Sequence, residues 1–153
     1  MTAFLLDVNV LIALIDPAHI QHDLAHEWFA AVGKTAWTTC PLTENGVLRI
    51  VGDTRYPNSP NTPAAVAELL SSLFALPGHL FWADDISLLD PQRLDSTRLL
   101  NSGQVTDSYL LALACAHGGQ LATFDRHLVT DAVRGGSQTA RVQGGGATRT
   151  RGV

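Results

Sequence analysis

The chain has 153 residues, of which 46% are hydrophobic, and its formal net charge is −4 at pH 7. This length allows one domain with a sizeable core, and the acidic balance excludes a protein that coats DNA through general basic charge. The charge is unevenly spread, because residues 1–125 hold 13 acidic and 5 basic side chains, whereas residues 126–153 hold five arginines and one aspartate.

The first half of the chain alternates predicted strands and helices. Residues 3–7, AFLLD, are apolar on both faces, which is typical of a buried strand in a parallel sheet. A helix is expected directly after it, over residues 10–15. The apolar spacing then predicts, in order, a helix over 20–32, a strand over 35–39 and a helix over 42–51.

The second half continues the alternation after a loop rich in Pro and Asn, residues 53–63. The pattern predicts a helix over 64–76, a strand over 79–83, a polar stretch over 84–103 with one short helical turn, a helix over 105–119, a strand over 120–124 and a last short strand over 140–142. We expect Thr106 or its neighbour to cap the helix over 105–119. Alternating strands and helices indicate an α/β fold with helices on both faces of a parallel sheet.

The end of the chain, QGGGATRTRGV, has no apolar periodicity and favours a disordered segment. We therefore predict one domain over residues 1–143 and a Gly/Arg-rich tail over 144–153.

The beginning of the chain has no basic residue before its apolar run, which is interrupted by Asp7 and Asn9. It is a poor signal peptide and too short for a membrane span. Cys40 and Cys115 lie in apolar contexts and are expected in the core rather than in a disulfide. These features favour a cytoplasmic protein without a membrane partner, and they do not decide whether it is also released from the cell.

Four acidic residues fall near the ends of predicted strands. Asp7 ends the first strand, and Glu44 lies in the first turns of the helix after the second. Asp107 opens the last long helix, and Asp125 directly follows the strand after it. Sites in parallel sheets form beyond the carboxyl ends of the strands, so we expect these four residues at one edge. A cluster of carboxylates alone suits Mg²⁺ or Mn²⁺.

Each of these residues also has a structural explanation. Asp107 and Asp125 are equally good as caps of a helix or turn, and Glu44 alone is typical of a solvated helix face. Asp7 is harder to explain, because its neighbours are apolar and an unpaired buried charge would cost several kcal/mol. Asn9 is either a helix cap or a donor that supports Asp7 or a water on the metal, and both interpretations stay open.

His22 and His26 are spaced four residues apart in a predicted helix, a spacing that can bind zinc. No cysteine lies near them, so a solvated helix face is the expectation.

Three spaced blocks carry a family resemblance. LLDVNVLIAL, CPLTENGVLRI and VTDSYLLALACAHGGQLATFD resemble the successive motifs of PIN-domain ribonucleases and, more narrowly, of the VapC toxins of type II toxin–antitoxin systems. The resemblance covers roughly residues 3–130. It implies a three-layer α/β/α PIN-like fold with a parallel sheet of four to five strands in the order 3-2-1-4-5.

The same resemblance implies the site. Asp7, Glu44, Asp107 and Asp125 would be the catalytic acids, around one or two Mg²⁺ or Mn²⁺ ions. Asp7, Asp107 and Asp125 would hold the metal, with Glu44 acting through water. Asn9 and Thr106 would support them through hydrogen bonds.

The activity implied is that of an endoribonuclease toxin that cuts a tRNA or a ribosomal RNA loop and inhibits translation. A cognate VapB-like antitoxin would neutralise it, the chain would form a homodimer, and no nucleotide cofactor is expected. The alternative is a catalytically silent module of the same fold that binds RNA or a protein partner. The full set of four acids favours the enzyme.

Overall fold

The computed structural model describes residues 2–135 and 139–143, so the predicted tail over 144–153 lies outside the described residues. Within this part of the chain, five short strands form one sheet: β1 (Phe4–Leu6), β2 (Trp37–Thr39), β3 (His79–Phe81), β4 (Gln120–Thr123) and β5 (Thr139–Arg141). Their order is β3-β2-β1-β4-β5, and every neighbouring pair is parallel. The predicted order 3-2-1-4-5 is confirmed, and so is the last short strand.

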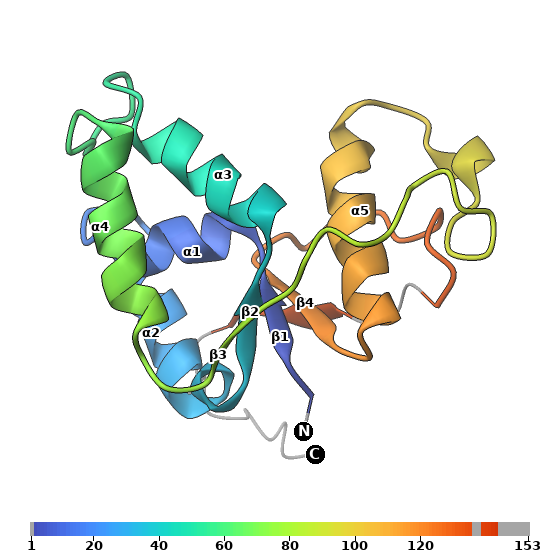
Figure 1. Cartoon of the computed structure of the whole chain (residues 1–153), viewed down its shortest axis with the longest axis horizontal. Coiled ribbons are helices and arrows are strands. Elements are labelled where there is room, and N and C mark those ends of the chain that lie inside the picture. The colour runs from blue at the N-terminus through green and yellow to red at the C-terminus, as the bar shows by residue number, and fades with distance from the viewer. Residues whose placement is uncertain (1, 136–138, 144–153) are drawn as a thin grey trace, which may run out of the picture.

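Helices cover both faces of this sheet. They are α1 (Val8–Ile15), α2 (His22–Ala31), α3 (Pro41–Val51), α4 (Pro63–Phe74) and α5 (Gly103–Ala116), with short 3₁₀ turns η1 (Gly33–Thr35) and η2 (Ser96–Arg98). Figure 1 shows α1 to α4 on one side of the sheet and α5 on the other. This is the three-layer α/β/α arrangement expected from the sequence. In the described residues, no helix has the length and apolar character needed to cross a membrane.

The core has two parts because successive strand residues point to opposite faces. Leu6 and Trp37 are fully buried under α1 to α4, whereas Leu5 and Leu121 are fully buried under α5. The central strand therefore has to be apolar on both faces, which explains the dense apolar run at the start of the chain.

The start of α5 differs from the prediction. The helix begins at Gly103, after Ser102, rather than near residue 105. Thr106 therefore lies inside the helix, and its predicted role as a cap is wrong. The side chain of Gln104 instead accepts the backbone N–H groups of Leu100 and Asn101, at 2.8 and 3.1 Å, and so organises the entry to the helix.

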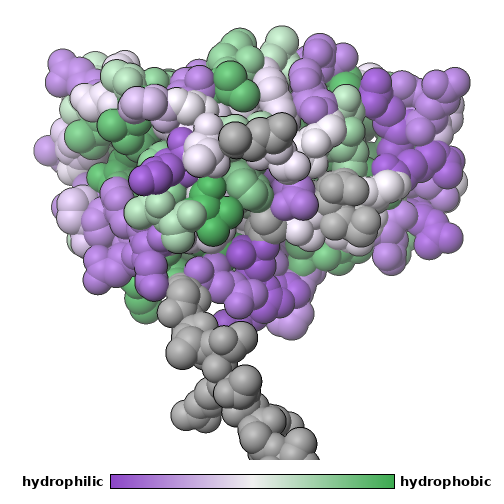
Figure 2. Space-filling view, turned by 90° about the horizontal axis from the view of Figure 1, so that it is seen from below, coloured by the Kyte–Doolittle hydropathy of each residue, from purple (hydrophilic) through white to green (hydrophobic). Residues whose placement is uncertain are grey.

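The segment between β3 and α5 is mostly exposed and contains only the short turn η2, as the sequence predicted. Hydrophilic residues gather at the right-hand end of the face in Figure 2, which is the end where Figure 1 places this segment. The segment thus presents a mostly polar surface at this end of the molecule, while Leu94 anchors it in the core under α5.

Candidate active site

Asp7 lies where β1 passes directly into α1. It is the N-cap of that helix, and its Oδ1 accepts the backbone N–H of Val8 at 2.8 Å. Its Oδ2 accepts the hydroxyl of Thr123 at 3.0 Å. These two donors compensate a carboxylate that stands among apolar neighbours. Burial still raises the pKa of Asp7, against the lowering effect of both hydrogen bonds, and the charge of Asp125 raises it further.

Asp125 is held by a turn at the end of β4. Its backbone N–H donates to the hydroxyl oxygen of Thr123 at 3.1 Å, and its Oδ1 accepts the N–H of His127 at 2.8 Å. The turn-forming role that the sequence allowed for Asp125 is thus present. Thr123 contacts both acids, and sequence reasoning missed it. The available signal was its position two residues before Asp125, on the same face of the strand.

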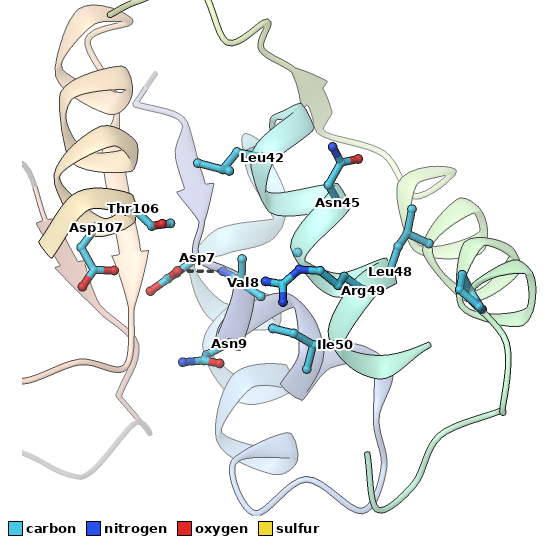
Figure 3. Close-up of a pocket in the computed structure, with 12 residues that line it drawn as sticks. Asp7, Val8, Asn9, Leu42, Asn45, Leu48, Arg49, Ile50, Thr106 and Asp107 are labelled. Atoms are coloured by element: carbon cyan, nitrogen blue, oxygen red, sulfur yellow. Dashed lines mark hydrogen bonds between the residues drawn. The ribbon is translucent and has the colours of Figure 1, made fainter. Parts of the chain in front are cut away.

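Asp107 comes from the opposite side of the site. It is the fifth residue of α5, so it does not cap that helix, as the alternative explanation had allowed. In Figure 3 its carboxylate and that of Asp7 point into the same space, one from α5 and one from the end of β1. Partial burial raises the pKa of Asp107 to about 6, and the charges of Asp7 and Asp125 contribute.

The charges of Asp7 and Asp125 thus act on Asp107, and that of Asp125 acts on Asp7, as expected for residues brought to one edge of the sheet. Among the residues that the structure describes, no three His, Cys, Asp or Glu side chains are close enough together to hold a metal ion as they stand. The chemistry of the donor set nevertheless fits Mg²⁺ or Mn²⁺, since all the donors are carboxylate oxygens.

Glu44 lies in the first turn of α3, as predicted, but its carboxylate is engaged elsewhere. Its Oε2 accepts the hydroxyl of Thr39, at the end of β2, at 2.7 Å. The contacts that the structure gives for Glu44 do not include the other three acids. This hydrogen bond engages Oε2, so Oε1 is the oxygen through which Glu44 would reach a water or an ion.

A depression of about 620 Å³ opens beside Asp7 and Asp107. Its lining combines these acids with polar and apolar residues from α1, α3, α4 and α5: Val8, Asn9, Leu42, Asn45, Gly46, Leu48, Arg49, Ile50, Pro63 and Thr106. A Cβ atom on Gly46 would lie 2.9 Å from Cγ2 of Val8, so glycine lets α3 approach the start of α1 closely.

Asn9 and Thr106 both line this depression and are exposed. Because Asp7 is the cap of α1, the interpretation of Asn9 as a helix cap is wrong. Its amide points to the same side as the carboxylate of Asp7 (Figure 3). A supporting role for Asn9 and Thr106 stays a prediction.

The histidines of α2 lie on a partly solvated face, with His26 exposed and His22 half-buried, and they also have a structural role. His22 Nδ1 lies 2.7 Å from the carbonyl of Ala13, and His26 Nε2 lies 2.8 Å from that of Leu14. A carbonyl can only accept, so both rings donate N–H groups to the last turn of α1. They anchor α2 to the end of the helix that Asp7 begins.

The sequence of this chain matches a protein family and several ribonucleases. A family model described as the PIN domain matches residues 4–131. The ribonuclease VapC44 of Mycobacterium tuberculosis (strain ATCC 25618 / H37Rv) is 42% identical over 134 residues, which cover 88% of this chain and 94% of that protein. Ribonuclease VapC39 of the same strain is 42% identical over 135 residues, covering 88% and 96%. Ribonuclease VapC38 of that strain is 42% identical over 126 residues, covering 82% and 87%.

Proposed function

This chain is a VapC-type member of the PIN-domain family, and we propose on that basis that it is a metal-dependent endoribonuclease toxin that hydrolyses phosphodiester bonds of RNA. The observation that carries the proposal is the convergence of three acids beside an open depression. Thr123 holds Asp7 and the turn at Asp125 together, and the carboxylate of Asp107 points into the same space as that of Asp7. Perturbed carboxylates gathered in a cleft are typical of sites that bind a cation or move a proton.

In this proposal Asp7, Asp107 and Asp125 hold Mg²⁺ or Mn²⁺, and Glu44 reaches it through water. The ion, when bound, would assist the deprotonation of the attacking water and offset negative charge on the phosphoryl group. Asp7 enters the site already oriented, because Val8 and Thr123 each hold one of its oxygens. A carboxylate that is fixed before the ligand arrives loses less side-chain entropy on binding.

Arg49 is the basic side chain among the residues that line the depression. It extends from α3 toward Val8 (Figure 3), and in the described part of the chain it forms no ion pair. We assign it to a phosphate of the RNA, since a guanidinium matches phosphate geometry. The RNA would be single-stranded or a loop of tRNA or ribosomal RNA, with products that carry a 5′ phosphate and a 3′ hydroxyl.

The apolar side chains beside the acids, such as Leu42, Leu48 and Ile50, support a second occupant of the same depression. A segment of a cognate VapB-like antitoxin with apolar and basic side chains would fit them and silence the toxin. We also propose that the chain forms a homodimer and that cleavage of its RNA target inhibits translation.

The test is cleavage of labelled tRNA and ribosomal RNA by purified protein free of antitoxin, with Mg²⁺ or Mn²⁺ and then with EDTA. We expect cleavage that needs the metal and that Asp7→Asn abolishes. Arg49→Gln should raise KM and leave metal affinity unchanged. Wild type without metal-dependent cleavage on either class of RNA would instead favour a silent module of the same fold, and binding of the same RNAs would then be measured.

The toxin role is tested separately through the neighbouring gene. We expect a small open reading frame beside this one whose product binds the purified chain and blocks cleavage. Expression of the chain alone should stop translation, and co-expression should restore it.

A further inference from the structure

Three side chains form a hydrogen-bonded chain that links the edge of the sheet to Glu44. The hydroxyl of Thr39 donates to Oε2 of Glu44 at 2.7 Å. The same hydroxyl oxygen lies 2.8 Å from Nε2 of His79. His79 is on the edge strand β3, and Thr39 ends β2. The hydrogen bonds therefore connect β3 to β2 and β2 to Glu44 on α3.

The direction of the protons follows from the chemistry of the three groups. A hydroxyl has one hydrogen, and an ionised carboxylate can only accept. Since Thr39 donates to Glu44, His79 must donate its Nε2–H to Thr39. His79 therefore carries a hydrogen on Nε2, and burial, which lowers its pKa, favours the neutral ring with that hydrogen alone.

The three hydrogen-bonded side chains are held in place by the residues packed around them. Thr39 is fully buried, and His79 pairs in the sheet with Trp37, whose side chain is on the same face. The ring of His79 stacks on Phe74 with centroids 4.4 Å apart and planes 7° apart, and it lies 4.6 Å from the ring of Trp37. These contacts leave the imidazole little freedom to turn, so its N–H is aimed at Thr39 before any ligand binds.

We propose that Thr39 and His79 are positioning residues that fix the carboxylate of Glu44 at the border of the acidic site. This inference rests on the proposed function, in which Glu44 reaches the metal through water. Groups that orient a residue bound directly to a metal typically change metal affinity by about 10- to 100-fold when they are removed, and because Glu44 acts through water we expect the lower end of this range. Thr39 and His79 would therefore matter for metal binding although neither touches the depression.

The first test uses NMR on the metal-free protein. The ¹⁵N shifts of His79 should show a proton on Nε2 and none on Nδ1, and the ¹³Cδ resonance of Glu44 should move in Thr39→Val. The matched control is Thr38→Val, which removes an equally buried hydroxyl from the neighbouring position of β2. A ring protonated on Nδ1, or a Glu44 resonance that does not respond to Thr39→Val, overturns the proposal.

The second test is Mn²⁺ affinity, measured by electron paramagnetic resonance. We expect Thr39→Val to weaken binding by about tenfold or more, whereas Thr39→Ser, which keeps the hydroxyl, and Thr38→Val should bind like wild type. Equal or tighter binding by Thr39→Val overturns the positioning role. A wild type that binds no Mn²⁺ contradicts the proposed function instead, and the NMR measurements then decide whether Thr39 and His79 position Glu44.

Discussion

The hydroxyl of Thr123 donates a 3.0 Å hydrogen bond to Asp7 Oδ2, across the boundary between the neighbouring strands β4 and β1. The same oxygen accepts the backbone N–H of Asp125. One buried hydroxyl therefore sets the positions of two acids that are far apart in the sequence. Because the strands are parallel, both acids emerge at the same edge, and Thr123 fixes their spacing.

Removing the hydroxyl of Thr123 should destabilise the folded protein. Thr123→Val leaves the Asp7 oxygen and the Asp125 N–H without their partner, and we expect the free energy of unfolding to fall by about 1–3 kcal/mol. Urea denaturation measures it, with Thr123→Ser as the control that keeps the hydroxyl. If the valine variant were as stable as the serine variant, the hydrogen bonds of Thr123 would not stabilise this edge.

Asp7 combines two roles that substitutions can separate. Asp7→Asn keeps an oxygen that can cap α1 but removes the negative charge, so without metal it should melt at or above the wild-type temperature. Asp7→Ala also removes the cap and should be less stable than Asp7→Asn by about 1 kcal/mol. Thermal unfolding in EDTA compares the three proteins. A clear drop for Asp7→Asn would mean that the charge itself stabilises the fold.

The order of strands and helices was predictable because apolar periodicity directly reflects which faces are buried. Phe4–Leu6 is apolar on both faces, and such a strand belongs in the middle of a covered sheet. The edge strand His79–Phe81 was also found, although two of its three residues are exposed. Helix starts were less accurate, since the caps at Asp7 and Ser102 depend on local backbone geometry.

The placement of Asp7, Asp107 and Asp125 near one another followed from parallel topology, but their hydrogen-bond partners did not. Thr123 reaches Asp7 across 116 positions of the sequence, and no local pattern predicts such a contact. The bond from Thr39 to Glu44 depends on the rotamers of both side chains. Sequence reasoning thus predicted the edge at which the acids lie and missed the hydroxyls that orient them.

The contact between α2 and the end of α1 gives a further prediction. His22 and His26 donate to carbonyls that have no partner within α1. His22→Ala and His26→Ala should each lower the free energy of unfolding by about 1 kcal/mol. His127→Ala, at an exposed position, serves as the control and should change stability little. Urea denaturation at pH 8 makes the comparison, and equal stability of all three variants would contradict the anchoring role.

The partial burial of Asp107, together with the charges of Asp7 and Asp125, predicts how stability depends on pH. The pKa of Asp107 is about 6 in the folded state against 3.8 for an unperturbed aspartate, so the folded state holds this proton more tightly. The resulting stabilisation is fully present below about pH 4 and is lost as the pH rises through about 6.

Asp107→Asn should abolish this loss of stability between pH 4 and pH 7, because the amide does not titrate. Between pH 4 and pH 7 we expect its free energy of unfolding to gain about 1 kcal/mol over wild type, a modest value because solvent screens the half-buried side chain. Urea denaturation across this range in EDTA measures the difference, and parallel pH curves for the two proteins would contradict it. Saturating Mg²⁺ should reverse the order at pH 7, because a cation that binds the folded state stabilises wild type and not the variant with a weakened site.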